Sequence, residues 1–392
     1  MWSSAFISLT TLLSLLIPHS SAQRRAGGRY IAGGGIAGAA PYALVDDYNA
    51  SNFFDKFFFF GSADPTNGHV QYRNRSIAQR DGLASISDRN NVILKPDTTN
   101  SYPGPAGNPG RPSVSLESLN AYSHGLFIFD AYHMPFGCGT WPAYWMAGPR
   151  FPTTGEIDMI EGTSLATVNS VSMYSPPDSN CSVSANGQSG FFVQGTCPYS
   201  TTPPSGCKSQ LRNMTALPNN YGAGYNSIQG GVYATEWTSS FIKTWWFPRD
   251  RIPASITAGA PDPAQFGTPA VNAQGSCNFT ESFVNQTVIF NINFCGSYAG
   301  TVYTSSHPTC PQSNSTAGNA RCIDWVGENP ANSTEAYWEI NRFQVYQMPA
   351  GARAIATSPS VPATQPTTPA LPRPKCTDLL IKGLAMFCYG PA

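Results

Sequence analysis

Turn-forming residues are so dense along this chain that they constrain its fold more than any other sequence feature. Between Pro41 and Pro349, short aromatic and β-branched runs alternate with clusters of Gly, Pro, Asn and Ser. The whole chain holds 36 glycines and 34 prolines among 392 residues. Such residues interrupt long helices and mark turns between strands. Runs such as Leu126–Phe129, Val288–Phe294 and Tyr337–Tyr346 show no sustained helical period. We therefore predict an all-β sandwich formed by one large domain.

Charge is scarce and balanced. Lys plus Arg and Asp plus Glu both number 22, and charged residues make up 11% of the chain. Soluble domains average about 25% charged residues. A nucleic-acid-binding protein would need a basic field, and disorder through charge excess would need a net charge. Both classes are excluded, so we expect no nucleic-acid partner.

The N-terminus predicts secretion. Residues 2–22 contain no Lys, Arg, Asp or Glu, and an apolar stretch runs from Ala5 to Ile17. That stretch is too short to span a bilayer but is typical of a signal peptide. We predict a signal peptide over residues 1–22, cleaved after Ala22. No later segment is long and apolar enough to predict a membrane span, and we expect an extracellular protein that is free or associated with the cell wall.

Cysteines and glycosylation motifs agree with this compartment. None of the cysteines is spaced C-x-x-C, which argues against a zinc or redox site, so we expect disulfides whose pairing remains open. We predict no metal and no cofactor. The ten cysteines are at positions 138, 181, 197, 207, 277, 295, 310, 322, 376 and 388. The eight N-x-S/T sequons begin at Asn49, Asn74, Asn180, Asn213, Asn278, Asn285, Asn314 and Asn332.

Composition divides the chain beyond the signal peptide. Residues 23–40 are rich in Gly and Ala, and Arg24-Arg25 is either a processing site or part of a flexible N-terminus. Residues 41–350 form the predicted domain. Residues 351–375 form a Ser/Thr/Pro linker, and residues 376–392 form a short tail whose two cysteines are expected to pair with each other.

One segment concentrates the acidic residues. In the run Gly155–Gly162, strand alternation places Glu156 and Asp158 on one face. Glu161 would point to the opposite face of a regular strand, because it lies five residues beyond Glu156. One β-bulge near Met159–Ile160 restores the register and places all three carboxylates on one face. We predict that bulge.

Clustered carboxylates suit glycoside hydrolysis. With the bulge, the Cα atoms of Glu156 and Glu161 lie about 13 Å apart. Their side chains could then approach the ~5–5.5 Å separation of retaining glycosidases. Like charges on one face split the pKa values of the group, as a nucleophile and a general acid require. The alternative, an exposed polar face without a role, is disfavoured by the scarcity of charge elsewhere.

Aromatic residues precede the acids. Alternation places Trp141 and Trp145 on one face unless Pro142 disturbs the strand. Trp rings stack on sugars, but a single Trp more often belongs to the core, and the residues alone favour a core position for Trp141. The run Phe57–Phe60 is expected to be a strand buried on both faces rather than a binding platform.

The sequence Glu-Ile-Asp-Met-Ile-Glu resembles the E-x-D-x-x-E signature of glycoside hydrolase family 16, the laminarinase and lichenase group. The resemblance covers roughly Tyr42 to Gln347. It is strongest to fungal-type endo-1,3(4)-β-glucanases. Further matching segments are Asp64–Val70, His133–Pro135, Cys138–Pro142, Ser240–Lys243, Trp246–Arg249 and Asn293–Gly296.

This resemblance implies a fold and roles. The fold would be a concanavalin-like β-jelly roll with a concave substrate cleft. Glu156 would be the nucleophile, Glu161 the general acid/base, and Asp158 a hydrogen-bond partner of Glu156. Trp145 would stack on the sugar beside the cleaved bond.

The chain also departs from the family pattern. Phe151 stands where relatives have Trp, Tyr174 where they have His, Tyr298 where they have Trp, and Ser115 where close relatives have Arg. Phe and Tyr can still stack on sugars, but the polar handles on the glucan differ. We expect Trp141, Phe151, Tyr174, Tyr298 and also Glu236 to contact substrate, whereas a structural role is an equal alternative for the neighbouring Trp237.

The residues and the resemblance together predict a secreted, monomeric endo-β-glucanase. It would hydrolyse β-1,3 or mixed β-1,3/1,4-glucan with retention of configuration. Two alternatives remain at this stage, a cell-wall glucan transglycosylase and a non-catalytic glucan-binding protein. The intact acid triplet disfavours the second.

Overall fold

The computed structural model describes residues 42–105, 110–185, 187–201 and 204–349. The predicted signal peptide (1–22), the Gly/Ala-rich segment (23–40), the linker (351–375) and the two-Cys tail (376–392) lie outside these described residues.

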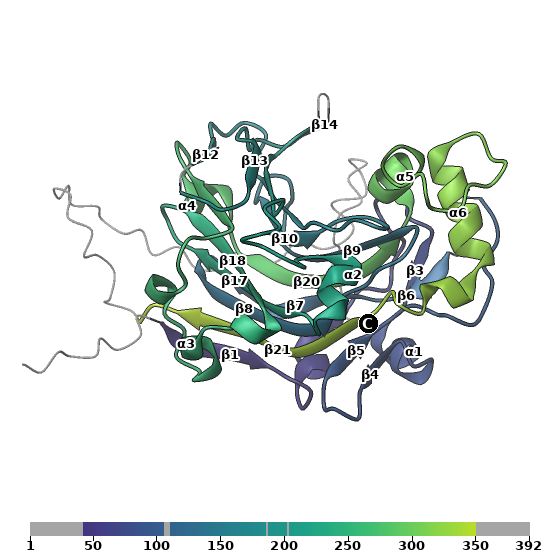
Figure 1. Cartoon of the computed structure of the whole chain (residues 1–392), viewed down its shortest axis with the longest axis horizontal. Helices are drawn as coiled ribbons and strands as arrows, with labels where there is room; N and C mark the ends of the chain where they lie inside the picture. The colour runs from purple at the N-terminus through teal and green to yellow at the C-terminus, as the bar shows by residue number, and fades with distance from the viewer. Residues whose placement is uncertain (1–41, 106–109, 186, 202–203, 350–392) are drawn as a thin grey trace, which may run out of the picture. The chain divides into compact units, whose positions relative to one another are not determined.

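Two large antiparallel sheets form the described domain, as Figure 1 shows. The first sheet has nine strands. Its hydrogen-bonded order is β12 (Ser184–Ala185), β19 (Val271–Gln274), β18 (Ile242–Pro248), β17 (Gly231–Trp237), β8 (Gly125–His133), β21 (Trp338–Gln347), β5 (Val92–Leu94) and β4 (Ala84–Ile86), and β1 (Ala43–Tyr48) also pairs with β21.

The second sheet has eight strands and carries the acidic segment. Its order is β13 (Phe191–Gln194), β16 (Cys207–Gln210), β11 (Ser170–Tyr174), β10 (Glu156–Glu161), β9 (Thr140–Ala147), β20 (Gln286–Phe294), β7 (Ser115–Tyr122) and β2 (Phe57–Phe59). The all-β prediction is confirmed, and the three runs proposed as strands coincide with β8, β20 and β21, except that Tyr337 directly precedes β21.

Smaller elements connect the sheets. Two short pairs are β14 (Ser200–Thr201) with β15 (Pro204–Ser205), and β3 (Val70–Tyr72) with β6 (Arg111–Ser113). The α-helices are α1 (Arg75–Arg80), α2 (Gly222–Ser227), α3 (Ala254–Thr257), α4 (Phe279–Ser282), α5 (Thr301–Ser306) and α6 (Gly318–Glu328). Single turns are η1 (Phe53–Asp55), η2 (Arg249–Arg251), η3 (Pro263–Gln265), the π-helical η4 (Gly296–Gly300) and η5 (Pro330–Ser333).

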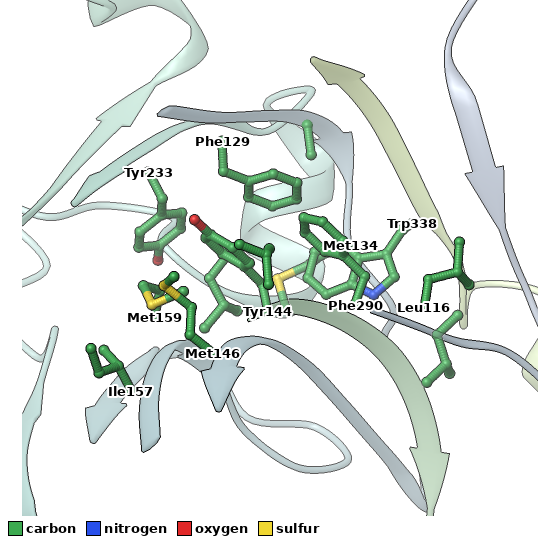
Figure 2. Packing of buried hydrophobic residues seen from close by; sticks show 14 of the residues in the cluster. Leu116, Phe129, Met134, Tyr144, Met146, Ile157, Met159, Tyr233, Phe290 and Trp338 are labelled. Atoms are coloured by element: carbon green, nitrogen blue, oxygen red, sulfur yellow. The ribbon is translucent and has the colours of Figure 1, made fainter. Parts of the chain in front are cut away.

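An aromatic core fills the space between the sheets (Figure 2). The rings of Tyr144 in β9 and Phe290 in β20 stack with centroids 5.1 Å apart. The ring centroid of Phe129, in the opposite sheet, lies 4.6 Å from that of Tyr144. Such pairs add about 0.5–1.5 kcal/mol each beyond the burial of their area. The core therefore holds β9 and β20 against β8, and β9 pairs directly with the acidic strand β10.

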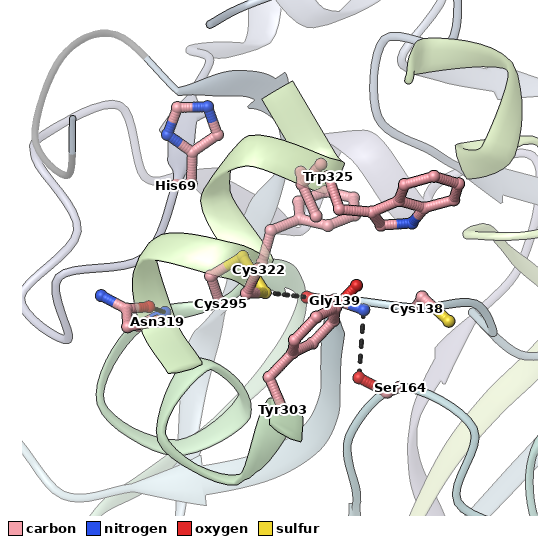
Figure 3. Close-up of a disulfide and its surroundings, with 12 residues drawn as sticks. His69, Cys138, Gly139, Ser164, Cys295, Tyr303, Asn319, Cys322 and Trp325 are labelled. Atoms are coloured by element: carbon pink, nitrogen blue, oxygen red, sulfur yellow. Dashed lines mark hydrogen bonds between the residues drawn. A yellow bond between two sulfur atoms is a disulfide. The ribbon is translucent and has the colours of Figure 1, made fainter. Parts of the chain in front are cut away.

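Four disulfides join segments among the described residues: Cys138–Cys310, Cys181–Cys277, Cys197–Cys207 and Cys295–Cys322. The expected pair Cys376–Cys388 lies outside the described residues. The Cys295–Cys322 bridge ties the end of β20 to α6, and Figure 3 shows it beside Gly139. Helix α6 was not predicted from sequence. It buries Cys322, Ile323 and Val326 on the face that meets this bridge.

Candidate active site

The predicted bulge is present in β10. Asp158 pairs with Trp145 of β9, but Ile160, two residues on, pairs with the adjacent Tyr144. Strand β10 therefore contributes two residues opposite one residue of β9, which defines a β-bulge. Pairing with β11 is interrupted at the same point, between Asp158 and Glu161. The extra residue returns Glu161 to the face of the strand that carries Glu156 and Asp158.

The bulge separates acids from apolar side chains. Ile157, Met159 and Ile160 are at most 1% exposed and belong to the core between the sheets. Glu156, Asp158 and Glu161 all line a cavity of about 470 Å³ on the other face of the sheet. Asp158 is the most buried of the three, at 4% exposure.

This cavity is walled by rings and polar groups from several strands and loops. It crosses the sheet from β10 over β9, β20 and β7. Besides the acids, its lining consists of Phe60, Asp64, Pro65, Thr66, Asn67, Tyr72, Ser115, Trp141, Ala143, Trp145, Phe151, Tyr199, Asn291, Asn293 and Ser297. An elongated, partly aromatic lining of this kind suits a chain of sugar rings.

Both tryptophans of β9 reach the cavity. Trp141 is not a core residue, because its Nε1 donates a hydrogen bond of 3.0 Å to Oε1 of Glu161. The Nε1 of Trp145 donates to Oδ1 of Asn291 at 2.9 Å. Pro142 therefore does not disturb the alternation. These bonds fix the planes of both indoles beside the acids.

Burial raises the pKa values of all three acids, and neighbouring carboxylates add to this rise at Glu156 and Asp158. Burial, and then the charge of Glu161, raise the pKa of Glu156 to about 8. Burial and the two neighbouring carboxylates raise the pKa of Asp158 well above its usual range. Burial also raises the pKa of Glu161, although the ammonium of Lys208 and the indole N–H of Trp141 oppose this rise. Near neutral pH the group therefore retains protons that isolated carboxylates would have lost.

An aromatic wall stands beside Glu156. Tyr174 is the direct register partner of Glu156, so the two share a face. The ring of Tyr199 lies 4.9 Å from that of Phe151 and 6.1 Å from that of Tyr174. Phe151 and Tyr199 line the cavity, whereas Tyr174 lies outside its lining with its ring against Gly206. Burial, and then the charges of the three acids, raise the pKa of Tyr174.

Tyr298 stands at the Glu161 side. Its ring meets the Trp141 ring edge-to-face with centroids 5.6 Å apart. The Nζ of Lys208 lies 5.7 Å from the Tyr298 ring centroid. Burial, and then the charges of Glu161 and Asp158, raise the pKa of Tyr298 to about 12. Tyr298 thus adjoins the cavity without being part of its lining.

The structure corrects the expectation for Glu236. This residue lies in β17 of the other sheet, and its carboxylate accepts a hydrogen bond of 2.8 Å from the Tyr42 hydroxyl. Strand alternation turns Glu236 away from the core that separates the two sheets. It therefore cannot reach the cleft. Its neighbour Trp237 is a buried core residue, as the structural alternative had it.

Sequence reasoning missed several lining residues. The expectation that Phe57–Phe60 is buried on both faces is wrong for one face. Phe57 and Phe59 are buried, but Phe58 and Phe60 are half-buried, and Phe60 lines the cavity. Tyr199 lies in a loop that carries no recognisable motif. Asn291 could have been found, because it is a polar residue at an alternating position of an otherwise apolar strand.

Two negative findings bound the chemistry of the described part of the chain. No group of three or more His, Cys, Asp or Glu side chains in it could hold a metal ion. None of its helices is long and apolar enough to cross a membrane.

Fold and site together define a class, a two-sheet β-sandwich with a carboxylate cluster in a cleft on one sheet. The family model of the XgeA-like catalytic domain of glycoside hydrolase family 16 matches residues 57–346. The chain therefore belongs to glycoside hydrolase family 16, and its sandwich is the jelly roll of that family.

Curated relatives agree with this assignment. A probable endo-1,3(4)-β-glucanase of Neosartorya fischeri is 39% identical over 347 residues, which cover 85% of this chain and 52% of the relative. The endo-1,3(4)-β-glucanase of Emericella nidulans is 39% identical over 329 residues, covering 82% and 50%. A probable glycosidase of Schizosaccharomyces pombe is 37% identical and covers 79% and 70%. The chain spans about half the length of the two glucanases.

Two solved structures are similar along nearly their whole length. An elongating family 16 β-1,3-glucosyltransferase is 40% identical with a TM-score of 0.72, covering 78% of this chain and 100% of its own. Laminarinase 16A of Phanerochaete chrysosporium, solved with β-glucans in donor and acceptor sites, is 34% identical with a TM-score of 0.70, covering 78% and 99%.

Proposed function

We propose that this protein is a secreted, retaining endo-β-glucanase that hydrolyses β-1,3 or mixed β-1,3/1,4-glucan. The observation that carries the proposal is the bulged strand β10, which presents Glu156, Asp158 and Glu161 together in one aromatic-walled cleft. The names of the curated relatives and of the laminarinase support the substrate class. The disulfides and the apolar N-terminus support secretion.

The reaction follows from the protonation of the triplet. In the reactive form, Asp158, the most buried acid, keeps a proton and shares it with Glu156, which is ionised. Because burial and the charge of Glu161 raise the pKa of Glu156 to about 8, this form becomes more populated as the pH rises toward 8. The Glu156 carboxylate bonds to the anomeric carbon while Glu161 gives its proton to the departing glycosidic oxygen. Glu161 then removes a proton from water, and the water oxygen displaces Glu156 from the anomeric carbon. The two displacements retain the configuration.

Trp145 and Trp141 position the sugars beside the acids in this proposal. Trp145 offers its ring next to Asp158, and Trp141 also tunes Glu161 through its indole N–H. Phe151, Tyr174 and Tyr298 supply further rings around the cleft. We propose a monomer, since one chain contributes the whole triplet.

A second candidate is a glucan transglycosylase. The elongating glucosyltransferase, at 40% identity, favours it specifically. A transglycosylase would use the same glycosyl-enzyme but pass the sugar to another glucan instead of water. The carboxylates alone do not distinguish these outcomes.

Product analysis from laminarin and lichenan tests the proposal. Wild type should release short oligosaccharides, and Glu156→Gln should release almost none while it is at least as heat-stable as wild type and still binds glucan. The preferred polymer would assign the linkage. Products longer than the input would establish transglycosylation instead. Unchanged polymers with the wild type, or full activity in Glu156→Gln, would reject the assignment.

A further inference from the structure

The cavity extends from β10 toward β7, and the sheet also continues from β10 in the other direction along its strand order. From β10 the order runs through β11 and β16 to β13, the last strand of this sheet among the described residues. Register leads from Glu161 to Ser170, then to Gln210, then to Phe191. Directly opposed residues of antiparallel strands point to the same face. Phe191 therefore stands on the cleft face of the sheet, in the same row as Glu161.

The ring of Phe191 is exposed to solvent and contacts a cation. The side chain is 53% exposed although it lies in a strand. The guanidinium of Arg212 lies over this ring, 5.2 Å from its centroid. A cation over one face restrains the ring while the rest of it remains accessible to solvent. An aromatic side chain held in this way can stack on a sugar.

Polar groups occupy the floor between the acids and this ring. Gln210 donates from Nε2 to the Ser170 hydroxyl at 3.3 Å, but its buried Oε1 has no hydrogen-bond partner among the described residues. Lys208, two residues earlier on the same face of β16, extends over Tyr298. An unpaired acceptor and an ammonium complement hydroxyl groups, which both donate and accept.

Spacing matches a chain several sugars long. Three strand-to-strand steps separate Glu161 from Phe191, or about 14 Å at the usual spacing. The cavity already crosses the sheet in the opposite direction, from β10 to β7. A glucan lying across the strands would thus meet aromatic rings both inside the cavity and beyond the acids.

We propose that Lys208, Gln210 and Phe191 form an outer subsite for the same β-glucan chain whose cleavage the proposed function assigns to the triplet; this inference rests on that function. Phe191 stacks on a distal glucosyl unit, and Gln210 and Lys208 bind hydroxyls between it and the acids. Long chains therefore bind more tightly than short ones, because only they reach Phe191.

Binding of glucans of two lengths tests this subsite without turnover. In a Glu156→Gln background, we would measure Kd for laminaritriose and laminariheptaose by calorimetry. Phe191→Ala should weaken heptaose binding by about tenfold, the scale of losing one aromatic contact, and leave triose binding unchanged. Phe191→Trp should retain heptaose binding. Gln210→Ala is the second variant and should also weaken the heptaose selectively.

Leu44→Ala is the matched control, because Leu44 is 47% exposed on β1 of the other sheet. It should change neither Kd. Equal heptaose binding by Phe191→Ala and its parent would overturn the outer subsite while leaving the proposed function intact. The outer subsite would also be overturned if the protein were a dimer that Phe191→Ala dissociates without a change in glucan affinity. The ring would then contact a second copy of the chain. No binding of either glucan by any variant would reject both proposals.

Discussion

Glu156, Asp158 and Glu161 lie together in the cleft, and their burial disfavours the state in which all three carboxyl groups are charged. Burial raises the pKa values of all three, and neighbouring carboxylates raise those of Glu156 and Asp158 further. Lys208 and Trp141 oppose the rise at Glu161. Differences in burial, hydrogen bonding and nearby charge decide which carboxyl keeps a proton. At the scale of single residues, the chemistry is therefore set by the immediate neighbours of each acid.

The raised pKa of Glu156 predicts how stability changes with pH. A carboxyl whose pKa rises from 4.5 to about 8 on folding stabilises the fold fully below pH 4.5, and this contribution is lost as pH rises through about 8. Glu156→Gln has no titrating group at this position, so its stability does not include this pH-dependent contribution. The variant should match the wild-type melting temperature near pH 4.5 and exceed it by at least about 3 °C at pH 8. A melting-temperature difference that is constant with pH, measured by calorimetry, would contradict this.

Trp141→Phe should shift the pH profile of activity. The indole N–H favours ionised Glu161, so its removal should raise the pKa of Glu161. If Glu161 is the general acid, the alkaline limb of kcat/KM on laminarin moves to higher pH, with plateau activity within about tenfold of wild type. Trp245→Phe is the control, because that indole donates to the Gly267 carbonyl outside the cleft. An unmoved alkaline limb in Trp141→Phe would disprove the coupling.

At the scale of elements, strand β10 depends on how it begins and where it bulges. Gly155 directly precedes Glu156 with φ of +76°, a conformation that side chains other than Gly rarely adopt. A Cβ there would lie 2.7 Å from Cδ1 of Phe283 and would overlap the backbone oxygen of Ser282. The entry into the strand therefore requires both the backbone freedom and the small size of glycine.

Gly155→Ala should thus destabilise the domain more than conformation alone explains. Gly82 has a similar φ of +69°, but nothing lies within 4 Å of its missing Cβ. Gly82→Ala should cost about 1–2 kcal/mol in the free energy of unfolding, and Gly155→Ala at least about 2 kcal/mol more. Urea denaturation of both variants measures the difference. Equal costs would mean that Ser282 and Phe283 yield easily to the added methyl group.

At the scale of the molecule, disulfides connect parts of the site that are distant in sequence. Cys295–Cys322 joins β20 to α6 immediately before the turn that carries Tyr298. Cys138–Cys310 ties the segment before Trp141 to the region after α5. Both bridges hold the Glu161 side of the cleft, where Trp141 and Tyr298 meet.

Replacing Cys295 and Cys322 together by Ala should lower the free energy of unfolding by roughly 3–4 kcal/mol, from the 27-residue separation that the bridge closes. Cys197 and Cys207 are only 10 residues apart, so their double replacement should cost about 1 kcal/mol less. Guanidinium denaturation of both proteins gives the comparison. The reverse order would show that native contacts, rather than chain entropy, dominate these bridges.

The sequence alone determined the β class, the bulge in β10 and the shared face of its three acids. These follow from turn density and from the two-residue period of a strand, which are local properties. The family signature added the assignment of roles to the acids. It could not place residues such as Glu236, because alternation defines a face but not which sheet carries it.

Only the tertiary structure decided which distant residues complete the cleft. Tyr199 comes from a loop, Lys208 from a strand two positions beyond β10, and Tyr298 from a turn near a disulfide. Their proximity depends on strand order and cysteine pairing, which join residues far apart along the chain. A local pattern carries no information about such contacts, because packing between the sheets selects them.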